Sequence, residues 1–249
     1  MSGHSHWAGI KHKKAANDAK RGKVWSKLAR TIIVAAKNGG GDASANLALR
    51  YAIDKAKAAN MPKDTIEKAI KKGTGELGAV NYEEVLYEGY ATGGVAVMVE
   101  ALTDNRNRTG PQIKKIFEKH GGSLGTSGCV NWMFSKKGLI TVNASATDEE
   151  SVMEIALAAG ADDMDNTGEV YEITCQPAAF DALRNALAEK EMPTEVAEIS
   201  MMPQSHISIE NEQTAKKILA LMEEFDDYDD VQNVYANFDI PDEILSTVS

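Results

Sequence analysis

The 249-residue chain contains only two cysteines, Cys129 and Cys175, and six prolines. Two cysteines this far apart are too few for a disulfide framework or a thiolate metal site, so we expect two reduced thiols. The chain also has no run near the roughly 18 consecutive apolar residues that a membrane-spanning helix needs. These absences argue against a disulfide-stapled secreted domain and against a membrane protein.

The N-terminus lacks the apolar core of a secretory signal peptide, because residues 1–7 lead straight into the basic segment 11–14. We therefore expect a cytoplasmic protein. Its 43% apolar and 26% charged residues are typical of a globular protein, and its length favours two or three domains.

Positive charge is scarce in the second half of the chain. Residues 143–249 hold 4 Lys and Arg against 25 Asp and Glu, whereas residues 1–72 hold 16 against 5 and residues 73–142 hold 7 against 7. The formal charge of −10 therefore hides a basic, a neutral and an acidic part. Such asymmetry indicates a segment that binds nucleic acid or a membrane surface, joined to something else.

A basic arm, residues 1–16, precedes a predicted helical bundle at residues 17–75. Three stretches with apolar residues at helical spacing end at glycines 39–41, at residues 60–62 and at Gly73. We expect Asp42 or Ser44 to cap the second helix and Pro62 to lie near the first turn of the third. Three helices with one apolar stripe each can bury those stripes only against each other.

From residue 79 the sequence alternates between strand-like and helix-like stretches, and we predict an α+β multidomain protein. Residues 79–129 supply two strands and a helix, with Thr109 as its expected cap and Pro111 in its first turn, and residues 203–249 supply a strand, a helix and a strand. Neither piece alone has enough strands to be stable. We predict that they join in one discontinuous α/β sandwich.

A second ferredoxin-like α/β sandwich is predicted at residues 130–202, inserted between those two pieces. Its order reads ββαβαβ, with a first hairpin from residues 130–134 to residues 139–142 across Lys136-Lys137-Gly138.

The strongest functional signal is a run of eight cations against one acid between residues 11 and 30. The cations are Lys11, Lys13, Lys14, Lys20, Arg21, Lys23, Lys27 and Arg30. On an arm and a helix face they would contact phosphates without reading sequence, and Trp7 would stack on an exposed base. A solvated helix face with a disordered tail is the alternative, but cations concentrated in an acidic protein favour nucleic acid, whether DNA or RNA.

Arg106 and Arg108 form a second cationic point, where a strand ends and a helix begins. Guanidinium groups beside a helix N-terminus make an anion site. In the alternative interpretation Asp104 and Asn105 form a turn, and the arginines pair with Glu100 or with the acidic domain.

Motifs of enzymes and metal sites fail on their context. His4, His6 and His12 have no nearby ligand to complete a zinc site. The glycines 73, 75 and 78 fit a dinucleotide motif, but they follow a helix. Ser123 fits a nucleophile motif, but the segment 121–125 follows a helix and precedes a strand. We expect no enzymatic activity, no cofactor, no metal and no small-molecule substrate.

The acidic stretch 223–230 is most simply a helix end and loop kept soluble by charge. Two sharper interpretations stay open. The stretch would repel nucleic acid and so orient the molecule, or it would fold back on the basic domain and compete with phosphate.

The chain resembles the YebC/PmpR family, which includes the mitochondrial translational activator of cytochrome c oxidase subunit I. The resemblance rests on Gly3-His4-Ser5-His6-Trp7, Lys13-Lys14-Ala15-Ala16, Asp18-Ala19-Lys20-Arg21-Gly22-Lys23, Gly39-Gly40-Gly41-Asp42, Glu88-Gly89-Tyr90, Asp104-Asn105-Arg106-Asn107-Arg108-Thr109 and Gly121-Gly122-Ser123-Leu124-Gly125. The chain departs from the family pattern at His6, where Lys is usual, and at Cys129, where a small hydroxyl residue is usual.

This resemblance implies a cytoplasmic protein of three domains without enzymatic activity, and a role in gene expression. Some members are described as probable DNA-binding transcriptional regulators and others as translation factors that act at the ribosome. Two hypotheses follow: a transcriptional regulator that binds DNA through the arm and first helix, or a ribosome-associated translation factor that docks the same basic face on ribosomal RNA.

Overall fold

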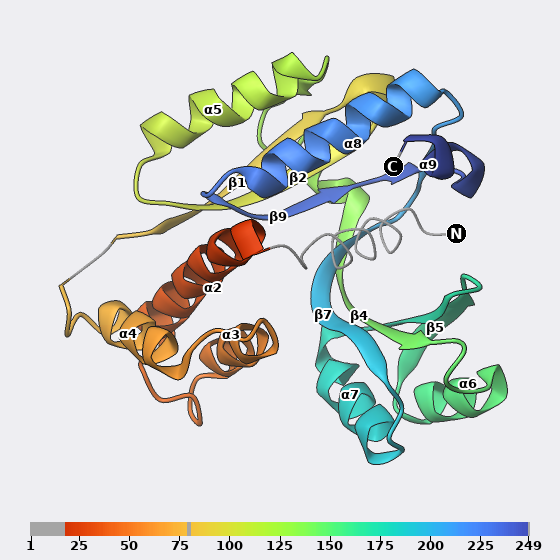
Figure 1. Ribbon diagram of the computed structural model, residues 1–249, viewed down its shortest axis with the longest axis horizontal. Helices are drawn as coiled ribbons and strands as arrows, with labels where there is room; N and C mark the ends of the chain where they lie inside the picture. The colour runs from red at the N-terminus through yellow and green to blue at the C-terminus, as the bar shows by residue number, and fades with distance from the viewer. Residues whose placement is uncertain (1–17, 79–80, 249) are drawn as a thin grey trace. The chain divides into compact units, whose positions relative to one another are not determined.

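The computed structural model describes residues 18–78 and 81–248, which fall into two compact units (Figure 1). We call residues 132–208 and 237–239 the acidic unit, because they hold 15 Asp and Glu against 4 Lys and Arg. The remaining described residues form the bundle–sheet unit. Both contain helices and β-sheet, and the chain has the expected α+β class.

Three helices open the bundle–sheet unit: α2 (Asp18–Gly39), α3 (Leu47–Ala58) and α4 (Lys63–Gly73). They enclose one core in which Ile32, Leu49 and Ala56 are completely buried. Gly73 permits close packing, because a Cβ there would lie 2.5 Å from the carbonyl oxygen of Ile33. The predicted three-helix bundle is confirmed for these residues.

The cap of α3 is Asn46, and not Asp42 or Ser44 as the sequence suggested. Its Oδ1 accepts the backbone N–H of Leu49 at 3.1 Å. Its Nδ2 donates to the carbonyl oxygens of Ala35 and Gly40, both at 2.8 Å. Asn46 therefore satisfies the start of α3 and the end of α2 together, while Asp42 Oδ1 accepts from Ser44 within the preceding turn.

An antiparallel sheet of order β3-β1-β2-β9 also belongs to this unit. Its strands are β1 (Glu83–Tyr90), β2 (Ala96–Thr103), β3 (Ser123–Leu124) and β9 (Val231–Ala236). Because β9 pairs with β2 in the register Val99 to Val234, two distant stretches of chain share one sheet.

Two helices, α5 (Arg106–Lys119) and α8 (Glu212–Asp227), lie side by side on one face of this sheet (Figure 1). The rings of Phe117 and Phe225 meet edge to face between them, with centroids 4.9 Å apart. Such aromatic pairs stabilise a core beyond the area they bury.

Glu88 on β1 fixes the chain at the point where it leaves this unit. Its carboxylate, which is 3% exposed, accepts the backbone N–H groups of Gly128, Val130 and Asn131 at 2.6, 2.9 and 2.7 Å. Burial raises the pKa of Glu88, but the three N–H donors outweigh burial and the pKa lies below its ordinary value. An ionised carboxylate therefore accepts the N–H groups of Gly128, Val130 and Asn131 in place of strand partners.

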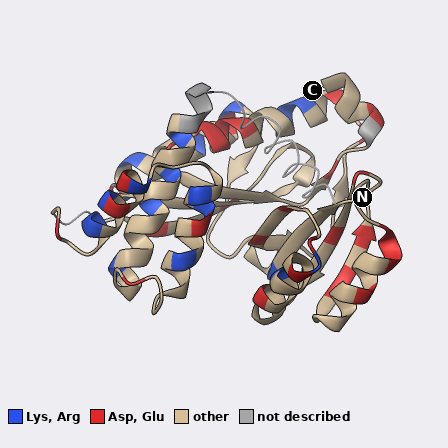
Figure 2. Cartoon of the chain, turned by 60° about the horizontal axis from the view of Figure 1, so that its bottom comes forward, with Lys and Arg blue, Asp and Glu red and all other residues tan. Residues whose placement is uncertain are grey.

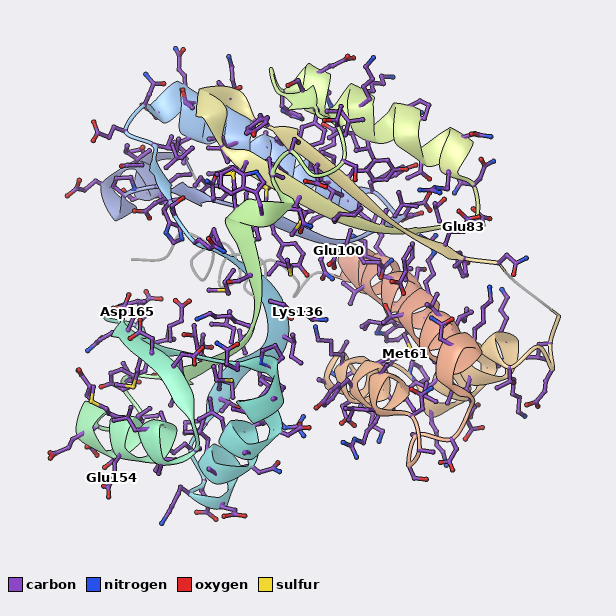
Figure 3. The ribbon with its side chains drawn as sticks, turned by 180° about the vertical axis from the view of Figure 1, so that it is seen from behind. Met61, Glu83, Glu100, Lys136, Glu154 and Asp165 are labelled. Atoms are coloured by element: carbon purple, nitrogen blue, oxygen red, sulfur yellow. The ribbon has the colours of Figure 1, made fainter. Side chains whose placement is uncertain are left out.

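The acidic unit has the order βαββαβ. Its elements are β4 (Phe134–Asn143), α6 (Glu149–Ala158), β5 (Ala161–Asn166), β6 (Val170–Cys175), α7 (Phe180–Glu189) and β7 (Thr194–Pro203). The antiparallel sheet order β5-β6-β4-β7 is that of a ferredoxin-like domain. Figure 3 shows Glu154 on α6 and Asp165 on β5 pointing outward from it.

The structure corrects the expected order within this unit. Residues 134–143 form one strand, not a hairpin. Gly138 lies within this strand, and its lack of a side chain is required there because a Cβ would meet Cys175 Sγ at 2.6 Å. The strand β5 was not expected, because its sequence Ala-Asp-Asp-Met-Asp-Asn lacks apolar alternation.

Short elements complete the chain. The strand β8 (Ile207–Ser208) pairs in parallel with β10 (Phe238–Asp239) instead of joining the sheet that contains β9. The helix α9 (Asp242–Val248) follows, and 3₁₀ turns occupy Thr92–Gly94, Asn131–Met133 and Pro177–Ala179. Among the described residues, no helix is both long enough and apolar enough to cross a membrane.

Replacing Asn46 tests its double role. Asn46→Ala removes the cap of α3 and leaves two carbonyl oxygens without their donor, so we expect a loss of about 2–4 kcal/mol in the free energy of unfolding. Asn46→Asp keeps the cap acceptor but lacks the amide donor, and should fall between Asn46→Ala and the wild type. Urea denaturation followed by circular dichroism measures both. Equal losses for the two variants would show that the cap acceptor contributes nothing, and an Asn46→Asp variant as stable as the wild type would show that the donors contribute nothing.

Candidate nucleic-acid interface

The eleven residues expected to contact nucleic acid are described unevenly. Trp7, Lys11, Lys13 and Lys14 lie outside the described residues. The backbone of Lys20 and Arg21 lies in α2, but their side chains are also outside the description. Lys23, Lys27, Arg30, Arg106 and Arg108 are described, all in the bundle–sheet unit.

Lys23, Lys27 and Arg30 form a row along α2, which we call the cationic row. Their spacing of four and three residues places them on one side of an α-helix. Figure 2 shows Lys and Arg spread over the helices of the bundle, and Asp and Glu along α6 of the acidic unit.

The cationic row contacts residues 226–230, which we call the acidic loop, at the C-terminal end of α8. Lys23 Nζ lies 3.4 Å from both the carbonyl oxygen and Oδ1 of Asp227, and Lys27 Nζ donates to the carbonyl oxygen of Asp226 at 2.6 Å. Arg30 donates to the carbonyl oxygen of Asp229. The last carbonyls of a helix lack intrahelical partners and carry its negative dipole end, so cations stabilise them.

Asp230 is the buried centre of this contact, with 4% of its surface exposed. Its carboxylate lies 3.1 Å from Nη1 of Arg30 and 2.7 Å from Nη2 of Arg108. The hydroxyl groups of Thr103 and Thr109 lie 3.2 and 2.7 Å from its Oδ2. One carboxylate therefore joins α2, the end of β2 and the first turn of α5.

These contacts decide the ionisation of Asp230. Burial alone raises its pKa, but the hydrogen bonds from Thr109 and Arg108 and the charges of Arg108 and Arg30 outweigh burial, so the pKa lies below its ordinary value. In return, the carboxylates of Asp230 and Asp104 raise the pKa of Arg108. Both partners are charged at neutral pH.

The second predicted site, around Arg106 and Arg108, is an ordered helix start. The helix α5 begins at Arg106, and its cap is Asn105, whose Oδ1 accepts the backbone N–H of Arg108 at 3.1 Å. Thr109 is therefore a buried helical residue and not the cap, and Pro111 lies beyond the first turn. The side chain of Arg106 is 62% exposed, and its Nε lies 3.6 Å from Oε2 of Glu83. Figure 3 shows Glu83 at the start of β1.

Arg108 is held by two carboxylates, because Asp104 Oδ1 also accepts from its Nη2 at 2.9 Å. An open pocket of about 370 Å³ lies beside it, lined by Arg30, Arg108, Gln112, Tyr228, Asp229 and Asp230. The sequence offered no local signal for Asp230 as the common partner of Arg30 and Arg108, since 200 and 122 residues separate the two pairs.

No group of three or more His, Cys, Asp or Glu side chains in the described ranges is arranged to hold a metal ion. The two cysteines are not joined by a disulfide, and burial raises the pKa of both thiols.

The lowered pKa of Asp230 predicts a dependence of stability on pH. An Asp in an unfolded chain titrates near pH 3.9, so the contribution of Asp230 is fully present above about pH 4 and is lost as the pH falls through the lower folded-state value. Asp230→Asn should lower the free energy of unfolding by about 2–3 kcal/mol at pH 7. The loss should be smaller at pH 3, where the wild-type carboxyl is closer to its neutral form. Urea denaturation of both proteins at the two pH values measures this, and a cost that does not change with pH would contradict the ionised contact.

Comparison with known proteins covers nearly the whole chain. The family model described as TACO1/YebC protein N-terminal domain matches residues 5–76. The family model described as TACO1/YebC second and third domain matches residues 82–238. The chain is 54% identical to a protein of Natranaerobius thermophilus, over 99% of this chain and 100% of that protein. It is 56% identical to a protein of Geobacter sulfurreducens, over 98% of each. Both relatives are named probable transcriptional regulatory proteins.

A crystal structure of a conserved hypothetical protein from Aquifex aeolicus has the same fold. It is 51% identical, covers 96% of this chain and 99% of its own, and superposes with a TM-score of 0.86. With both domain models and full-length relatives above half identity, the chain belongs to the TACO1/YebC family.

Proposed function

We propose that this protein is a non-enzymatic regulator of gene expression that binds nucleic acid through its basic N-terminal arm and the first helix of the bundle. The names of its full-length relatives as probable transcriptional regulatory proteins support a role in transcription, for which DNA is the partner that we propose. The proposed contacts are Trp7, Lys11, Lys13, Lys14, Lys20, Arg21, Lys23, Lys27 and Arg30, with Arg106 and Arg108 as a second point.

The observation that carries this proposal is the separation of charge along the chain. Residues 1–72 hold 16 Lys and Arg against 5 Asp and Glu, whereas the acidic unit holds 4 against 15. Phosphate attracts the cations of residues 1–72 and repels the acids of the acidic unit. The protein should therefore bind with its arm and bundle facing the nucleic acid.

The residue types favour contact with phosphates over reading of bases. Lysines act as point charges on a backbone that is the same for every sequence, whereas base reading needs Arg, Asn or Gln placed against base edges. The cations of the second and third helices of the bundle are mostly lysines, and we expect weak sequence preference from this domain.

Reversing charges in the arm tests the proposal. The variant in which Lys13, Lys14, Lys20 and Arg21 are all replaced by Glu should bind a random-sequence DNA duplex more than about tenfold more weakly at physiological salt, because four phosphate contacts are lost. The plot of log binding constant against log salt concentration should also become less steep, with the magnitude of its negative slope smaller by about 3–4. Fluorescence anisotropy over a salt series measures both quantities.

A matched control removes the effect of net charge. Lys136, Lys190, Lys216 and Lys217 are exposed and lie outside the proposed interface, so their replacement by Glu changes the net charge equally. This control should bind almost as the wild type does, and equal weakening in both variants would refute a localised interface. Ribosome co-sedimentation lost only in the arm variant, without binding to duplex, would replace the transcriptional role with that of a translation factor.

A further inference from the structure

The cationic row is the part of the proposed interface on α2 whose side chains are described, and all three of them already hold anionic or carbonyl oxygens. Lys23, Lys27 and Arg30 each donate to the acidic loop. A phosphodiester group offers the same kind of oxygen acceptors to the same donors. The same side chains cannot satisfy both partners in full.

We propose that the acidic loop is an intramolecular competitor for nucleic acid, which covers the cationic row until phosphate displaces it. This inference rests on the proposed function, because it concerns the regulation of that same surface. The partner that displaces the loop is a phosphodiester backbone, whether of DNA or of RNA.

The strength of the cover changes along the row. The side chains of Lys23 and Asp227 are 48% and 51% exposed and lie 3.4 Å apart, and such surface ion pairs contribute little and weaken with salt. At the other end, the side chains of Arg30 and Asp230 are 18% and 6% exposed. The loop is therefore anchored at Asp230 and is displaced first at Asp227.

The loop also acts at a distance. Asp227 and Asp229 are exposed beside the cationic row. Their charges therefore repel an approaching phosphate even where the carboxylate forms no ion pair with a cation of the row. Arg108, the second proposed contact, is held by Asp230 as well. The same loop therefore limits both cationic points.

Neutralising the exposed loop charges tests the competition without touching a proposed contact. The double variant Asp227→Asn and Asp229→Asn should bind a short random-sequence duplex about three- to tenfold more tightly than the wild type at low salt. The control is Glu154→Gln with Asp165→Asn, two exposed acids of the acidic unit, which gives the same net charge. The loop variant should bind more tightly than this control.

A second measurement follows the loop directly in the wild-type protein. A water-soluble carbodiimide joins a paired lysine and carboxylate as an amide, so mass spectrometry should find Lys23 linked to Asp227. Saturating duplex or single-stranded RNA should lower the yield of this link at least severalfold more than added salt of equal ionic strength does.

The outcomes separate the two proposals. If nucleic acid binds in an arm-dependent manner, the link persists and the two neutralised variants bind alike, then the loop has only a structural role and the competition is refuted. If the wild type binds neither probe, the proposed function itself fails, and this inference fails with it.

Discussion

The carboxylate of Asp230 holds the bundle–sheet unit together at one point. Asp230 lies directly before β9, and its backbone oxygen accepts the N–H of Leu102 at 2.8 Å. Its side chain pairs with Arg30 and Arg108. The bundle, the central strand β2 and the helix α5 therefore share one buried negative charge. A buried charge is costly unless it is paired and hydrogen-bonded, and here two guanidinium groups and two threonine hydroxyls supply the partners.

This arrangement changes the meaning of the charge separation seen in the sequence. The basic start of the chain and the acidic segment near its end are not simply two independent surfaces, because part of each neutralises the other within one unit. The acidic unit, by contrast, has 15 Asp and Glu but only 4 Lys and Arg of its own. Negative charge thus has two uses in this chain: it pairs with specific cations, and under the proposed function it also repels phosphate from the acidic unit.

Local sequence patterns were enough for the helices and for most strands. The apolar stripe that includes Leu49, Ala52 and Ala56 is buried as expected, and the strand-like run before Thr103 is the central strand β2. Patterns failed where a tertiary partner decides the conformation. Nothing local distinguishes Asn46 from Ser44 as a cap, because the choice depends on the carbonyl groups at the end of α2. The candidate site was predicted from the concentration of cations between residues 11 and 30, but the partner Asp230 was not, since a pair separated by 200 residues leaves no periodic signal.

The pairing of β9 with β2 has a consequence for the order in which the protein forms during synthesis. The bundle and the strands β1 and β2 emerge first, but their sheet lacks a strand until residues 231–236 are made, after the whole of β4 to β7. Domains that emerge as complete units fold as the chain grows. The acidic unit's own four-stranded sheet is therefore complete earlier than the sheet that surrounds it in sequence, and α2 displays its cations uncovered on a growing chain until the acidic loop has left the ribosome.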